Sequence, residues 1–139
     1  MALVAVSGCL AAAPTSPESA ARDPNAATVV AEIALERGDC RSAAETYAAA
    51  AQRGALSVAR RASEVALACE HLPAAWESVK RWRALAPDDR DANAVYATVA
   101  LKLYHIPEAR QGIVAVIKAQ AESGGDLDAD SIRKPLARP

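Results

Sequence analysis

One helix-pair pattern recurs three times along this chain of 139 residues and limits what the chain can fold into. In each copy a small residue is followed four positions later by a larger apolar one, which places both on one face of a helix. The pairs are Ala43 with Tyr47, Ala75 with Val79, and Ala109 with Ile113. Twelve residues before each alanine stands another small residue, namely Ala31, Ser63 or Ala97. We expect these nine residues to pack the helices of the repeats together.

The spacing of the pattern points to a helical repeat. The steps between the three alanines are 32 and 34 residues, and a period of about 34 residues built from two short helices is typical of a tetratricopeptide array. Hydrophobic residues make up 52% of the chain and aromatic residues only 4%, a composition that favours closely packed helices. We therefore predict an all-α fold, a tetratricopeptide-like α-solenoid of about three antiparallel helix pairs over residues 26–122.

Turn residues give the expected helix limits. Gly38, Gly54 and Pro87 stand between apolar periodic segments, where they end helices or separate them. Pro73 and Pro107 suit the first turn of a helix. The six helices are predicted over about 26–37, 40–52, 56–70, 73–86, 91–104 and 107–120.

The amino-terminal segment predicts a membrane address. Val6-Ser7-Gly8-Cys9 resembles the lipobox of bacterial lipoproteins, in which a peptidase cuts before a cysteine that receives lipid. Only eight residues precede Cys9 and none is charged, so residues 1–9 are predicted to be a truncated signal peptide. Leu10, rather than Asp, after the cysteine implies the outer membrane by family habit. The alternative is a chance Ser-Gly-Cys in a cytosolic protein.

The regions flanking the repeats differ from them in composition. Residues 10–25 are rich in Ala, Pro and Ser, and we predict a flexible tether there. Residues 123–139 are polar and contain prolines. Because a solenoid needs a terminal cap over its last apolar face, this tail looks inadequate, and we expect it to be a truncated continuation of a longer array.

Two cysteines lie inside the repeats. Cys40 and Cys69 are symmetric about the turn at Gly54 and Ala55, so antiparallel helices on either side should bring them face to face. In an oxidising compartment they would form a disulfide. The alternative is a pair of free thiols that pack as small apolar side chains.

Catalytic, metal-binding and nucleic-acid-binding signals are weak. The sequence has no Gly-rich phosphate loop and no supported Ser-His-Asp order, and His71 and His105 are isolated on separate helix ends. The net charge of −1 gives no long-range field for nucleic acid. The basic runs Arg60-Arg61 and Lys80-Arg81-x-Arg83 are expected on solvated helix flanks, and the alternative is that they contact an acidic patch of a partner. We predict no enzyme activity, no metal and no cofactor.

The two tryptophans have different expected roles. Trp82 occurs where such repeats usually hold a small residue, so we expect it to fill the space between the second and third pairs. For Trp76, core packing and contact with a partner protein are about equally supported, because exposed Trp often anchors interfaces. Tyr96 is expected inside the third pair, and Tyr104 is expected to be partly exposed.

With these features placed, the run from Val29 to Val116 resembles the start of a group of proteobacterial outer-membrane tetratricopeptide lipoproteins. The matching segments are Ala31-Glu32-x-Ala34-x-x-Arg37-Gly38, Ala43-Ala44-x-x-Tyr47, Ala59-Arg60-Arg61-Ala62, Ala74-Ala75, and Trp82-Arg83-x-x-Ala86-Pro87-Asp88-x-x-Asp91-Ala92. That group includes an adaptor which binds a periplasmic carboxy-terminal processing protease and helps it degrade cell-wall hydrolases.

The expected function is therefore that of a periplasm-facing scaffold, anchored to the outer membrane by lipid on Cys9. The resemblance implies that its partners are a periplasmic protease and the substrates of that protease. A factor for assembling pili or outer-membrane proteins is one alternative. The repeat module of a larger enzyme is another, and it would require catalytic sequence beyond Pro139.

Overall fold

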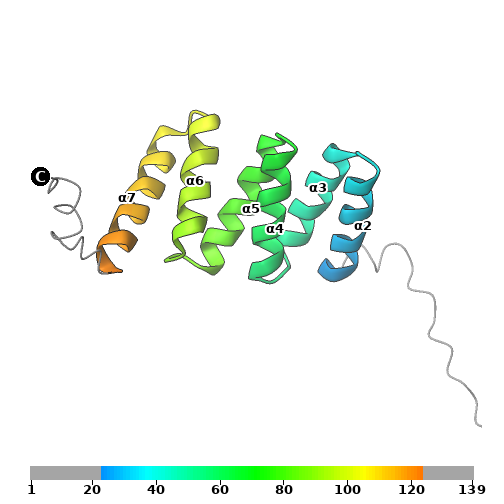
Figure 1. The fold of residues 1–139 in the computed structure, drawn as a ribbon, viewed down its shortest axis with the longest axis horizontal. Helices are drawn as coiled ribbons and strands as arrows, with labels where there is room; N and C mark the ends of the chain where they lie inside the picture. Colours follow the sequence, from blue (N-terminus) through cyan, green and yellow to red (C-terminus); the bar gives the residue numbers. More distant parts are fainter. Residues whose placement is uncertain (1–22, 124–139) are drawn as a thin grey trace, which may run out of the picture.

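The computed structural model describes residues 23–123. The predicted signal with Cys9, nearly all of the predicted tether and the tail from residue 124 onward lie outside this range. Six α-helices follow one another along the long axis of the molecule in chain order (Figure 1). They are α2 Pro24–Glu36, α3 Cys40–Ala51, α4 Leu56–Ala68, α5 Leu72–Leu85, α6 Arg90–Lys102 and α7 Ile106–Glu122.

The fold is all-α, as predicted, and residues 23–123 contain no β-strand. Neighbouring helices pack in antiparallel pairs, an arrangement compatible with a repeat solenoid (Figure 1). No helix in the described part of the chain combines the length and the apolar content that a bilayer crossing needs.

The core consists mostly of alanine, with Tyr47, Val79, Trp82, Tyr96 and Val99 as its larger buried members. Eight of the nine residues predicted to pack the repeats are buried: Ala31, Ala43, Tyr47, Ser63, Ala75, Val79, Ala97 and Ala109. Small side chains at the contacts let helix axes approach closely. One close approach is at Gly112 of α7, where an added Cβ would lie 2.8 Å from Cβ of Ala97 on α6.

Ile113 is the exception, because its side chain is 44% exposed. The position was predicted from its equivalence to Tyr47 and Val79, which the next helix covers. No described helix follows α7, so its outer face is open, and Val114 and Ile117 on the same helix are also exposed. The sequence pattern is repeated here, but the helix that would bury the residue is not among those described.

The turns inside the three pairs have one common geometry. Gly38, Glu70 and Tyr104 occupy equivalent positions, and all three have positive φ, at 75°, 53° and 59°. In each turn the next residue donates its backbone N–H to the carbonyl five residues earlier, as from Asp39 to Ala34. This is the Schellman arrangement that closes helix ends. The left-handed conformation predicted at Gly38 therefore recurs where the sequence has no glycine.

Helix α2 begins earlier than predicted. Asp23 accepts a hydrogen bond from the backbone N–H of Asn25 at 3.0 Å, and Pro24 occupies the first turn. Proline is favoured at that position because it lacks the N–H that would otherwise be unpaired there. Residues 24 and 25 thus belong to the helical domain, and the prediction that placed them in the tether was wrong.

Cys40 and Cys69 are joined by a disulfide, with their Cα atoms 5.4 Å apart. Cys40 is the first residue of α3, and Cys69 follows the last residue of α4. The bond connects the first helix pair to the second, which is the juxtaposition predicted from the symmetry about the turn at Gly54.

Candidate binding groove

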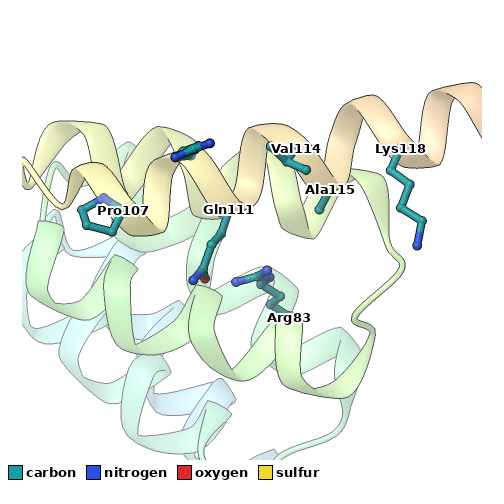
Figure 2. Close-up of a pocket in the computed structure, with 7 residues that line it drawn as sticks. Arg83, Pro107, Gln111, Val114, Ala115 and Lys118 are labelled. Carbon is teal, nitrogen blue, oxygen red and sulfur yellow. The ribbon is translucent and has the colours of Figure 1, made fainter.

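Three adjoining hollows run along the carboxy-terminal half of the array. The largest, of about 570 Å³, lies between α5 and α7 (Figure 2). It is lined by Arg83, Pro107, Arg110, Gln111, Val114, Ala115 and Lys118. Hollows of about 340 Å³ and about 180 Å³ continue from it and share Arg83 and Lys118 with it, respectively. Together the three hollows form one open groove, which we call the α5–α7 groove.

The charge along this groove is uneven. Arg83, Arg110 and Lys118 line the largest hollow and no carboxylate does. The hollow beside it adds Lys80 and is also free of acidic lining. Carboxylates enter only at the end near the carboxy terminus of α7, where Asp88 and Glu122 line the smallest hollow. Most of the groove is therefore cationic on a chain whose net charge is −1.

Arg83 of α5 is held in place by two neighbours from α6. Its Nε donates a hydrogen bond of 2.8 Å to Oδ1 of Asn93. Its guanidinium carbon lies 4.3 Å from the ring centroid of Tyr96, within the range of a cation–π contact. Both partners are uncharged, so the positive charge of Arg83 is positioned but not neutralised by a carboxylate. In Figure 2 the side chain points across the hollow toward Gln111 of α7.

Asn93 is itself fixed, which makes this support rigid. Its side chain is 1% exposed, and its amide nitrogen donates to the carbonyls of Pro87 at 2.8 Å and Asp89 at 2.9 Å. The same turn receives a hydrogen bond of 3.1 Å from the indole Nε1 of Trp82 to Asp89. Trp82 is 2% exposed, so it packs inside the array as the sequence predicted.

An aromatic cluster lies next to Arg83. Trp76 of α5 stacks on Tyr96, with ring centroids 4.9 Å apart, and His105 meets Trp76 edge-on at 5.1 Å. Trp76 is half-buried in these contacts, and Tyr96 is buried. Trp76, which the sequence offered as a partner contact, thus helps to join the second pair to the third. Tyr104 is 85% exposed, as its predicted place at a helix end allows.

The two histidines act near helix starts. Nδ1 of His71 accepts a hydrogen bond of 3.2 Å from the backbone N–H of Ala74, which caps α5, and its Nε2 lies 3.3 Å from Oε1 of Glu45. His105 precedes α7 and contacts Trp76. Within residues 23–123, no group of three or more His, Cys, Asp or Glu side chains could hold a metal ion.

A separate polar network connects the first two pairs. The Tyr47 hydroxyl donates a hydrogen bond to the Glu32 carboxylate, and Arg61 of α4 donates to the same oxygen from Nη2 at 3.0 Å. The Tyr47 hydrogen bond, aided by Arg61, lowers the pKa of Glu32 below its usual value. Burial raises the pKa of Tyr47, and Glu32 raises it further.

The basic runs were predicted on solvated flanks, and Arg60, Arg61 and Lys80 are exposed, whereas Arg81 and Arg83 are half-buried. Several of these side chains also have defined partners. Arg61 is engaged by Glu32 and Arg83 by Asn93 and Tyr96. Arg60 pairs with Glu64 at 3.1 Å and lies over the Trp82 ring. The pairing of Arg60 with Glu64 follows from their i,i+4 spacing on α4. The contacts of Arg61 and Arg83 depend on neighbouring helices, and helical spacing alone does not predict them.

Comparison with known proteins does not extend this picture. No family model matches the chain, and neither the curated proteins nor the solved structures gave a significant match. The functional argument therefore depends on the residues and their geometry.

Proposed function

We propose that this chain is a non-catalytic protein-binding scaffold on the periplasmic side of a bacterial outer membrane, to which lipid on Cys9 anchors it. The observation that supports this most is the α5–α7 groove, whose lining comes from two successive helix pairs. Stacked helix pairs form extended surfaces that suit the binding of other polypeptides.

The disulfide supports the proposed compartment. Disulfides persist in secreted and periplasmic proteins and are rare in the reducing cytosol. The Cys40–Cys69 disulfide crosses the contact between α3 and α4 and so connects the first repeat to the second. This favours an oxidising compartment, and the lipobox resemblance at Cys9 supports the periplasm as that compartment.

Within this proposal, the bound protein is a processing protease or one of its cell-wall hydrolase substrates. The support is the resemblance of the repeats to the lipoprotein adaptors described above. In that role the scaffold would raise the local concentration of protease and substrate, and it would need no catalytic residues of its own.

Two experiments test the proposal. Fatty-acid labelling of the chain expressed behind a complete signal sequence should mark the wild type and not Cys9→Ser, and label that survives the substitution would overturn the anchor. Affinity capture from envelope extract should retain a protease or a hydrolase. Capture of neither, with the disulfide-bonded protein on the resin, would remove the adaptor role.

A further inference from the structure

We propose that the α5–α7 groove binds an extended, acidic segment of a partner protein, with Arg83 and Arg110 as its principal anchors. This inference depends on the proposed scaffold function, and it goes further by assigning the surface and the chemistry of the partner. It follows from three features of the groove, which are its charge, the fixed position of Arg83 and its apolar lining.

Charge complementarity identifies the partner as anionic. Arg83 and Arg110 make no ion pair with any carboxylate in the described part of the chain, whereas Lys118 lies 3.7 Å from Glu122 in an exposed pair. Some other basic residues of the array form ion pairs, for example Arg61 with Glu32 and Arg60 with Glu64. Arg83 and Arg110 differ from them because they line the same hollow. Two arginines that face one hollow without a counter-ion are suited to bidentate hydrogen bonds with carboxylates.

The support behind Arg83 shows that this site is built into the fold. Its guanidinium is held by Asn93, which is 1% exposed, and by the buried ring of Tyr96. A side chain that is already ordered loses less conformational entropy when a ligand binds, so affinity increases. The buried amide and the ring therefore hold Arg83 in the lining of the hollow.

The shape and the lining of the groove favour a polypeptide. The three hollows adjoin one another and share lining residues, so together they offer more surface than a compact ion would cover. Pro107, Val114 and Ala115 give apolar surface between the cations, and Val114 is 55% exposed. We therefore expect a segment in which acidic and apolar residues are mixed. Asp88 and Glu122 line the smallest hollow, so the anionic part of that segment should lie near Arg83 and Arg110 instead.

The test is fluorescence anisotropy on the full chain with a short labelled peptide rich in glutamate and leucine. The matched peptide, in which each glutamate is glutamine, is the control. The acidic peptide should bind at least ~10-fold more tightly than its control, since hydrogen bonds between charged groups give differences of this size. Its affinity should also fall as ionic strength rises. Equal binding of the two peptides would overturn the proposal.

Variants locate the binding site. Arg110→Gln, at an exposed position that cannot disturb the core, should weaken binding of the acidic peptide about tenfold, and Arg83→Gln with Arg110→Gln should weaken it further. Arg41→Gln with Lys102→Gln removes the same net charge outside the groove and should leave binding unchanged. If the control pair weakens binding as much as the groove pair, the groove is not the site.

Other occupants of the groove have separate readouts. The sequence after α7 contains Asp126, Asp128 and Asp130. If changing all three to Asn increases the affinity for the acidic peptide about tenfold, the chain's own tail occupies the groove. Binding to phosphatidylglycerol vesicles that depends on Arg110, without peptide binding, would assign the groove to a membrane surface. Either result overturns a partner protein as the occupant.

Failure of this inference differs from failure of the scaffold function. If the groove variants still capture a protease or hydrolase from envelope extract, the scaffold stands and its binding surface lies elsewhere. If the wild type captures neither but binds the acidic peptide, the groove assignment stands and the adaptor role is lost.

Discussion

The two halves of the array are stabilised in different ways. The contact between the first and second pairs contains a disulfide, Cys40–Cys69, and a charged network in which Glu32 pairs with Arg61. The contact between the second and third pairs is made by stacked Trp76 and Tyr96 and by Arg83 on Asn93. Charges are therefore paired with each other in the first contact, and in the second a cation is held by neutral groups.

This difference separates a structural contact from a binding surface. A paired charge has little to offer a ligand, because binding would require the existing pair to be broken. A fixed cation without a carboxylate keeps its full electrostatic attraction for an incoming anion. The amino-terminal half thus has the features of a rigid base, and the carboxy-terminal half those of a recognition surface. Four predictions test how sharply the halves differ.

The disulfide should give the largest effect on stability. The bond closes a loop with a sequence separation of 29 residues, and the chain-entropy estimate for a loop of that size is about 3–4 kcal/mol. Reduction, or Cys40→Ser with Cys69→Ser, should lower the free energy of unfolding by about that amount. Urea unfolding with and without reductant measures it. The serine variant serves as its own control, because reductant should not change its stability further.

If reductant lowers the free energy of unfolding of the serine variant as much as that of the wild type, another cysteine is responsible for the effect. No shift in the wild type would mean that the thiols already act as apolar packing, which was the alternative drawn from the sequence. In that case the two halves would differ by the charged network alone.

The close contact of α7 with α6 at Gly112 should give the next largest effect on stability. At Gly112 an added Cβ would lie 2.9 Å from the carbonyl oxygen of Asn93 as well as 2.8 Å from Cβ of Ala97. Since this carbonyl is backbone, α7 must move away from α6, and overpacking of this kind costs about 1–3 kcal/mol. Gly112→Ala should lower the melting temperature in circular dichroism, whereas Gln120→Ala, exposed on the same helix, should leave it nearly unchanged.

Gly112→Ala also tests how the groove depends on helix spacing. Asn93 holds Arg83, so a shift at its carbonyl should weaken acidic-peptide binding as well as stability. A variant that is destabilised but binds normally would show that Arg83 needs no such support.

The three equivalent turns give a matched pair of smaller effects with opposite signs. Gly38 has φ of 75° with open space around it, so Gly38→Ala should cost about 1 kcal/mol from backbone strain alone. Tyr104 has φ of 59° and is 85% exposed, so Tyr104→Gly loses almost no packing and relieves that strain. We expect it to stabilise the protein by about 0.5–1 kcal/mol. Chemical denaturation of the two variants side by side checks the signs.

These turns also show what the sequence could and could not predict. Helical periodicity and small residues at constant spacing predicted six helices in three pairs, because each repeat buries the same positions in the same way. Glycine at position 38 indicated a left-handed turn, but Glu70 and Tyr104 gave no such indication. There the next helix and the Schellman hydrogen bonds fix the backbone, and such tertiary constraint overrides local preference.

The candidate groove was harder to foresee for a related reason. Arg83 belonged to a basic run that looked solvated, and nothing in its spacing showed that Asn93 and Tyr96 would fix it. Arg110 and Lys118 gave no signal of their own, since an exposed cation on a helix is ordinary. The charge of the groove depends on which cations lack a counter-ion after folding.

By contrast, the disulfide could be predicted from the sequence. Cys40 and Cys69 are symmetric about a turn, and antiparallel packing of the two helices brings such positions close together.

The smallest predicted effect concerns pH and the amino-terminal network. Folding lowers the pKa of Glu32 below its usual value of 4.5, so the folded state favours the carboxylate. Its contribution to stability is present above that pH and is lost as the pH falls through the lowered pKa. The Arg61 and Glu32 side chains are 48% and 44% exposed, so solvent screening should keep this contribution below about 1 kcal/mol.

Urea unfolding of the wild type and of Glu32→Gln between about pH 6 and pH 3 should give free energies of unfolding that converge as the pH falls. Tyr47→Phe should also make the stability of the protein depend less on pH in this range, because it removes the hydrogen bond that lowers the pKa of Glu32 most. Curves that stay parallel would mean that the pair adds nothing measurable, and the amino-terminal half would then differ from the other by its disulfide alone.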